Sequence, residues 1–133
     1  MSLREKLSSK RYQGAIEFIV EERSADRVVA KMPIRDGVLN PFGTVHAGAM
    51  IWLADVAATL CAIGDSEIDD KGRGFPLAVD LHAVLLGNQR QGVLTAEAQV
   101  VRRGGRVIVV RTEVTGDNGA LLIDVTTTHV PAL

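Results

Sequence analysis

Residues 45–63 constrain the fold of this 133-residue chain more than any other stretch. The run contains no proline and is rich in alanine and leucine, which favour the α-helix. Almost every side of such a helix would be apolar, so we expect it to be buried nearly all round. A turn should precede it, because Asn40 lies before a proline and is kept out of the helical region. The hydroxyl of Thr44 is then placed to cap the first helical turn.

Asp55 is the most informative residue of this predicted helix. A carboxylate in a buried apolar helix is costly unless it is paired, hydrogen-bonded or needed for function. Thr59 lies one turn later on the same face, within reach of a group that Asp55 touches. The helix start also offers free backbone N–H groups near His46, Ala47 and Gly48, where a developing negative charge could be held.

The spacing along the helix predicts how these groups can cooperate. Ala47 and Asp55 are eight residues apart, which corresponds to about 12 Å of helix. One small reacting group cannot touch both the amide of Ala47 and the carboxylate of Asp55 in the same chain. If the two act together, they come from different subunits, and the site lies at a dimer interface.

One motif resembles a known signature: Asn40-x-x-Gly43-x-x-His46-Ala47-Gly48, followed by Asp55. It is similar to that of the hotdog-fold acyl-CoA thioesterases of the phenylacetate-degradation (PaaI-like) type. Their pattern is Asn-x-x-Gly-x-x-His-Gly-Gly, with an acidic residue nine positions after the histidine. Every spacing agrees, and Ala47 alone departs, since it stands where the family usually has glycine.

The resemblance implies a hydrolase that splits an acyl-CoA thioester into free acid and coenzyme A, with no metal and no cofactor beyond the substrate's own coenzyme A. Asp55 would be either the nucleophile, through a mixed anhydride, or the general base for water. The N–H of Ala47, with Gly48 as a second donor, would hold the thioester oxygen. Asn40 would orient the substrate or water, and it would come from the subunit that does not supply Asp55. The alternative is that Asn40 only stabilises the turn. His46 would have a structural or positioning role beside the oxyanion site.

Two further positions bear on this site. The family often places a serine or threonine near the start of the third strand, and Ala78 occupies that position here. Because that hydroxyl is missing, Thr59 becomes a stronger candidate for bonding Asp55 or the incoming water. The alternative is that Thr59 bonds its own backbone, as helical threonines often do. A metal site built from His46, Asp80 and His82 is disfavoured, because their spacing matches no zinc pattern.

A basic cluster surrounds the predicted Gly104-Gly105 hairpin and consists of Arg102, Arg103 and Arg106. Arginine suits the phosphates of coenzyme A, so we predict a role in binding that part of the substrate. The alternative is a solvated hairpin tip, with Lys71 and Arg73 as competing phosphate partners.

The rest of the chain predicts a single α+β domain over residues 1–133, with residues 1–13 as a tail or short helix. Alternating apolar residues and turn signals predict six strands, over residues 15–22, 27–32, 77–86, 93–102, 106–115 and 120–130. They indicate an antiparallel sheet with a segregated helix. The resemblance adds the hotdog topology, a sheet wrapped around the helix, and a homodimer joined edge to edge or a homotetramer of two such dimers.

Composition excludes several classes. A net charge of −1 argues against nucleic acid binding. A single cysteine rules out an internal disulfide and suits a reducing cytoplasm. The first six residues lack the apolar segment of a signal peptide. The central Asp55 makes residues 45–63 a core helix rather than a membrane span.

Two other functions fit parts of the pattern. A non-catalytic hotdog domain that binds or senses acyl-CoA would tolerate Ala47 and Ala78, whereas the retained Asp55 and Asn40 favour the enzyme. A hotdog hydratase or dehydratase would use an Asp–His pair with a different spacing. For the enzyme, aryl, short-chain and medium-chain acyl groups all remain compatible with the sequence.

Overall fold

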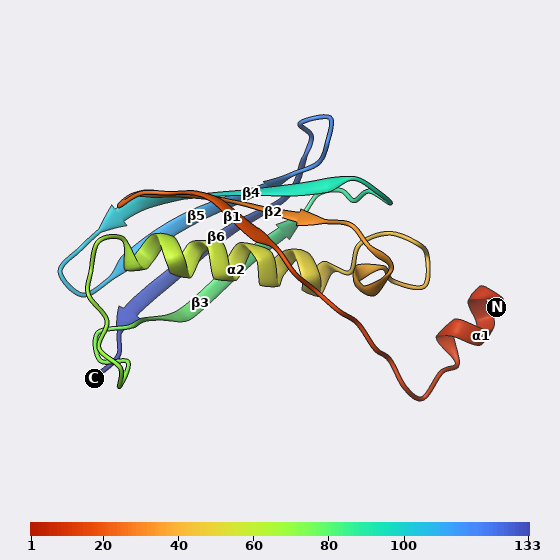
Figure 1. Ribbon diagram of the computed structural model, residues 1–133, viewed down its shortest axis with the longest axis horizontal. Coiled ribbons are helices and arrows are strands. Elements are labelled where there is room, and N and C mark those ends of the chain that lie inside the picture. Colours follow the sequence, from red (N-terminus) through yellow and green to blue (C-terminus); the bar gives the residue numbers. More distant parts are fainter.

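The computed structural model describes residues 1–133, which form one antiparallel sheet with a long helix, α2 (Ala47–Ile63), lying across it (Figure 1). A short helix, α1 (Leu3–Leu7), and a 3-10 turn, η1 (Asp36–Val38), precede α2. The strands are β1 (Ile19–Arg23), β2 (Arg27–Pro33), β3 (Pro76–Leu85), β4 (Val93–Arg103), β5 (Ile108–Thr115) and β6 (Leu121–Pro131). Their order in the sheet is β1-β2-β4-β5-β6-β3. The predicted α+β class is therefore confirmed.

All six predicted strands are present, four of them within one residue of the expected bounds at both ends. The first begins late, at Ile19, because the N–H of Ala15 donates to the carbonyl of Gly37 (3.0 Å) and not to a strand. The fifth begins at Ile108, because the N–H of Gly104 donates to the carbonyl of Val107 (2.9 Å) and closes the hairpin there. Both differences arise where a turn uses backbone groups that a strand would need.

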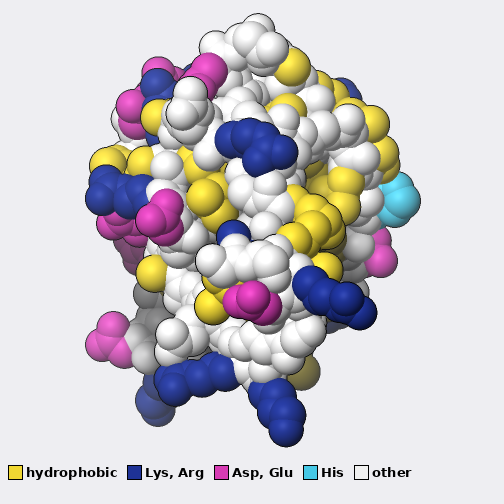
Figure 2. Space-filling view, turned by 90° about the vertical axis from the view of Figure 1, so that its right-hand side faces the viewer, with side chains coloured by type: hydrophobic (Ala, Val, Ile, Leu, Met, Phe, Trp, Pro, Cys, Tyr) yellow, Lys and Arg dark blue, Asp and Glu magenta, His cyan; other side chains and the backbone are white.

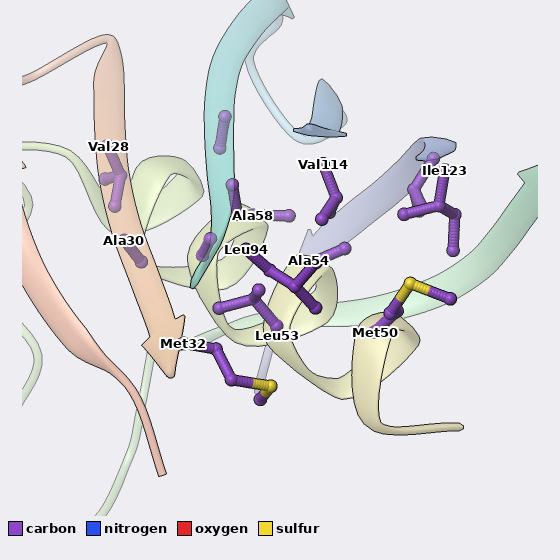
Figure 3. Packing of buried hydrophobic residues seen from close by; sticks show 14 of the residues in the cluster. Val28, Ala30, Met32, Met50, Leu53, Ala54, Ala58, Leu94, Val114 and Ile123 are labelled. Atoms are coloured by element: carbon purple, nitrogen blue, oxygen red, sulfur yellow. The ribbon is translucent and has the colours of Figure 1, made fainter. Parts of the chain in front are cut away.

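The core lies between α2 and the four inner strands of the sheet. Buried residues largely alternate with more exposed ones along these strands, as expected when one face of a sheet is covered. They pack against the buried face of α2, as Figure 3 shows for Val28, Ala30, Met32, Leu94, Val114 and Ile123 beside Met50, Leu53, Ala54 and Ala58. Alanine on α2 keeps side chains short at the contact, so the helix can lie close to the sheet.

The opposite face of α2 differs from the prediction of a helix buried nearly all round. Its side chains are only half-buried; they include Ile51, Trp52, Asp55, Val56, Thr59 and Leu60. The prediction is wrong for a single chain, because the sheet covers one side of the helix, while the other side is bordered only by Phe18 and by an open groove to β3. The helix also begins at Ala47, two residues later than expected.

Strand β3 is an unusual sheet edge. Only Pro76 of its ten residues is buried. The exposed fractions of its large apolar side chains run from 38% to 60%, for Leu77, Val79, Leu81, Val84 and Leu85. A long, apolar, unpaired edge is a template for pairing with another strand, and soluble proteins normally protect such edges.

The N-terminal segment extends away from the sheet and ends in α1, none of whose residues is buried (Figure 1). Residues 1–13 thus contain the short helix that was one of the two expectations. Seen from this end, the surface carries Lys and Arg side chains around scattered exposed hydrophobic ones (Figure 2). None of the helices has both the length and the apolar character needed to cross a membrane.

Candidate active site

Asn40 organises the turn that leads into α2. Its Oδ1 accepts hydrogen bonds from the N–H groups of Phe42 (2.9 Å) and Thr44 (3.2 Å), and its Nδ2 donates to Thr44 Oγ1 (2.8 Å). These contacts match the turn role that was the alternative for this residue. One Nδ2 proton lies outside them, because a carboxamide has two N–H donors, so contact with substrate stays a prediction.

The start of α2 is capped differently from the prediction. The N-cap residue is His46, and no side chain bonds the first-turn amides. The expected cap by Thr44 is wrong, because the Thr44 side chain and backbone are both engaged by Asn40. The carbonyl of His46 accepts from Ala49 (3.0 Å) and Met50 (3.2 Å).

Two amides at this end have no partner. The N–H groups of Ala47 and Gly48 make no hydrogen bond within the chain, and Gly48 is exposed. The positive end of the helix dipole adds to their attraction for an anion. The arrangement suits an oxyanion, and the role of these amides in holding a thioester oxygen stays a prediction. The exposed side chain of His46 lies directly beside them and makes no hydrogen bond of its own.

Asp55 lies in a groove between α2 and the edge strand β3. A cavity of about 510 Å³ is lined by Gly48, Ile51, Trp52 and Asp55 on α2 and by Ala78, Val79, Asp80 and Leu81 on β3. A second cavity, about 380 Å³, continues toward the C-terminal end of α2 and is lined by Asp55, Val56, Thr59, Leu60, Ile63, Phe75, Leu77 and Ala78. Asp55 and Ala78 line both cavities, so the carboxylate stands where the two meet.

The surroundings of Asp55 correct one expectation and refine two others. The carboxylate is half-buried and has no hydrogen bond or ion pair in the chain, whereas a helix buried nearly all round would have buried it. It is therefore free to act on a bound molecule. Thr59 shares the second cavity with it, without a hydrogen bond between the two side chains. Ala78 faces the same space and presents a methyl group where the family often has a hydroxyl.

Trp52 and Asp80 are groove residues that sequence reasoning missed as parts of this site. Trp52 lies between Gly48 and Asp55 on the helix face that lines the first cavity. Its ring packs edge-on against that of Phe18, with the ring centroids 4.8 Å apart. The signal was available for Trp52, since positions 48, 52 and 55 share one face of a helix. Asp80 places a second carboxylate on the opposite wall.

The three arginines of the β4–β5 hairpin differ in their contacts. The guanidinium of Arg103 donates to the carbonyls of Ala62 (2.8 Å), Ala25 (2.8 Å) and Cys61 (3.2 Å), so it caps the C-terminal end of α2. Its charge complements the negative end of the helix dipole. The prediction of a phosphate contact is therefore corrected for Arg103, whose donors are occupied by these carbonyls. Arg102 and Arg106 are exposed and form no ion pair, and their phosphate role stays a prediction.

Other reactive residues are structural. Burial raises the pKa of the Cys61 thiol, whose Sγ donates to the carbonyls of Asp26 (3.3 Å) and Ala98 (3.6 Å). His129 is fully buried, with Nε2 2.8 Å from Thr127 Oγ1 and Nδ1 3.2 Å from the carbonyl of Pro76. No three His, Cys, Asp or Glu side chains lie close enough together to hold a metal ion.

Comparison with known proteins places this site in context. Residues 7–130 match the family described as a domain of unknown function, DUF4442. ComA2 of Bacillus subtilis strain 168, a protein provisionally named an esterase, is 30% identical over 95 residues. The aligned residues cover 71% of this chain and 73% of ComA2. The 1,4-dihydroxy-2-naphthoyl-CoA hydrolase of Listeria monocytogenes is 26% identical over 107 residues, 80% of this chain and 82% of the hydrolase.

A solved structure extends the comparison to the fold. A mutant of the thioesterase enzyme SAV0944 from Staphylococcus aureus superposes with a TM-score of 0.75 and 27% identity. The superposition covers 85% of this chain and 91% of that one. The chain thus shares its fold with a thioesterase of known structure.

Proposed function

The chain belongs to the DUF4442 family and is a hotdog-fold thioester hydrolase, and from this premise we propose that it cleaves acyl-CoA to a free acid and coenzyme A. The observation that carries the proposal is the combination, on α2, of two unpaired N–H groups and an unpartnered carboxylate. The Listeria relative, named for a CoA thioester, supports the choice of substrate. The motif favours the phenylacetate-degradation type, and the single buried Cys61 suits a cytoplasmic setting.

We propose that the working unit is a homodimer, or a dimer of such dimers, joined through β3. Two copies of an edge strand can pair antiparallel about a two-fold axis, which makes the contact identical for both chains. This pairing would satisfy the free backbone groups of β3 and cover its exposed apolar side chains.

The same symmetry would bring the two halves of the site together. Val79, Asp80 and Leu81 lie near the middle of β3, and the first cavity sets them opposite Ile51 and Trp52 of α2. A two-fold axis at this level makes the two α2 helices antiparallel. Ile51 is halfway between Ala47 and Asp55 in the chain, so the Ala47 amide of one subunit would lie level with the Asp55 carboxylate of the other.

Two routes then fit the geometry. In the first, Asp55 takes a proton from water as the water oxygen bonds to the thioester carbon, and the carbon–sulfur bond breaks to release the coenzyme A thiolate. In the second, an Asp55 oxygen attacks and expels the thiolate, and water then hydrolyses the mixed anhydride. Both routes place negative charge on the thioester oxygen, where one N–H donor contributes about 3–4 kcal/mol.

The proposal is tested with a panel of aryl, short-chain and medium-chain acyl-CoAs, by measuring release of free thiol. We expect turnover of at least one class, with kcat/KM of about 10⁴ M⁻¹s⁻¹ or above. Tight binding without thiol release from any substrate would contradict hydrolysis. That result would favour the acyl-CoA-binding alternative, which Ala47 and Ala78 make the second candidate.

Arg102 and Arg106 are proposed to contact the phosphates of coenzyme A. Changing both to glutamine should raise KM for acyl-CoA by about five- to tenfold, because exposed charge pairs contribute roughly 1 kcal/mol. KM for the matching acyl-pantetheine, which lacks the nucleotide, should stay unchanged. Arg4→Gln on the exposed helix α1 is the control for loss of an arginine. Equal changes for both substrates would assign the two arginines to something other than the nucleotide.

A further inference from the structure

We propose that Asn88 is a positioning residue that holds the oxyanion amides of α2 in place. The inference rests on the proposed function, because it concerns the same two amides, Ala47 and Gly48. Asn88 lies far from them in sequence, in the loop between β3 and β4, and it belongs to no recognised part of the motif.

The contact between Asn88 and the turn before α2 is bidentate. Asn88 Oδ1 accepts from the N–H of Val45 (3.0 Å), and Asn88 Nδ2 donates to the carbonyl of Val45 (2.7 Å). The side-chain amide therefore pairs with Val45 as a neighbouring strand would. Oδ1 also accepts from the N–H of Gln89 (2.8 Å), which fixes the orientation of the carboxamide.

Val45 is held from the other side as well. It forms an isolated antiparallel bridge with Leu39, and the next residue, His46, donates its N–H to the carbonyl of Val38 (2.8 Å). The Val45 side chain is fully buried. The backbone just before α2 is thus clamped between residues 38–39 and Asn88. The free amides of Ala47 and Gly48 follow within three residues, so their direction depends on this clamp.

The loop that carries Asn88 is itself anchored to the sheet. The N–H groups of Leu86 and Gly87 donate to the carbonyl of Leu122 (2.8 and 3.1 Å). Asn88 therefore transmits the position of a rigid sheet to the end of α2.

A second contact from the same loop acts on the same turn. Arg90 Nη1 donates to the carbonyl of Phe42 (2.7 Å), and a Cβ at Gly43 would lie 2.8 Å from that nitrogen. Gly43 also has a φ of +83°, which favours glycine. The loop and the turn are thus fitted closely, although only Asn88 bonds the residue that leads directly to the free amides.

Fixed geometry at these amides should affect the chemical step more than substrate binding. A displacement of about 1 Å can cost about a hundredfold in rate. An interaction that matters only in the transition state lowers kcat and leaves KM unchanged. These two properties give the clamp a kinetic signature that a simple stabilising contact would not have.

The test compares Asn88→Ala with Gln89→Ala in the full-length enzyme. Gln89→Ala removes side-chain bonds of the same loop, to Gln91 and Asp117, and none to the α2 turn. Asn88→Ala should lower kcat by about ten- to a hundredfold with KM within about twofold. Gln89→Ala should keep kcat within about twofold. Asn88→Asp retains the acceptor for the Val45 N–H and should recover part of kcat; it also serves if Asn88→Ala does not fold.

An amide NMR spectrum gives a readout independent of activity. In Asn88→Ala, the resonances of Ala47 and Gly48 should shift, while those near Ile63 should not. Unchanged kcat in folded Asn88→Ala, or an equal loss in Gln89→Ala, would overturn the proposal. If the wild-type protein hydrolysed no acyl-CoA, the proposed function would fail, and unshifted Ala47 and Gly48 resonances would separately remove the clamp.

Discussion

Asp55→Asn is expected to lower kcat for acyl-CoA hydrolysis by about 10³-fold, within the range of 10²–10⁴ for loss of a general base. Asparagine keeps the shape of the side chain and can neither attack the thioester nor take a proton from water. The carboxylate makes no bond within the chain, so the fold has little to lose. The free energy of unfolding should stay within about 0.5 kcal/mol of wild type. Thiol release and denaturant unfolding of the purified variant measure the two quantities.

Asp80→Asn is the matched control, because Asp80 is the other carboxylate that lines the first cavity. It changes the charge of the groove equally and is not assigned a role in the chemistry, so its loss in kcat should stay below about tenfold. Asp55→Asn that retained most of its activity, or lost no more than Asp80→Asn, would show that the carboxylate of Asp55 is not the reacting group.

The second large effect is expected from Ala47→Pro, alone and mixed with Asp55→Asn. Proline removes the N–H of Ala47 and suits the first position of a helix. The preceding His46 has φ −56° and ψ 132°, which lies outside the α-helical region that a following proline disfavours. The helix should therefore remain, while kcat falls by about 10²–10³-fold through loss of one oxyanion donor. Ala47→Gly, which keeps the N–H, should retain wild-type activity or exceed it.

Mixing the two inactive variants then tests whether the site is shared. In a mixed dimer one site carries both changes and the other carries neither. Random exchange of subunits makes about half of the dimers mixed, so about a quarter of wild-type activity should return. Mass spectrometry establishes the exchange, and thiol release measures the recovery. If Ala47 and Asp55 of one chain formed a site together, every site would keep a defect, and exchange without recovery would reveal this.

The local features of the fold follow from the sequence because they depend on neighbouring residues. Four of the six strands lie within one residue of the predicted bounds at both ends, since alternation and glycine turns are read over a few positions. The apolar, proline-free run after His46 likewise predicts the helix, and any helix has free N–H groups at its start. The motif spacing indicated the thioester hydrolase, and the Listeria relative and the solved thioesterase agree.

Contacts between segments that lie far apart in the sequence could be identified only in the tertiary structure. Arg103 reads as a free cation in the sequence, yet it caps α2 because the hairpin folds beside the carbonyls of Ala62 and Cys61. Asn88 reads as an ordinary turn residue, and only the fold brings it to Val45, 43 positions earlier.

Asp55 shows most directly what the sequence determines and what only the tertiary structure decides. Its place on an apolar helix marked it as functional from the sequence alone, through the cost of burying an unpaired charge. Whether the charge is buried, however, depends on what covers the helix. The sheet covers one side of α2, and β3 borders an open groove on the other, so the carboxylate stays accessible and unpartnered. Residue type and spacing determined which group is reactive, and the packing of distant strands decided what that group can reach.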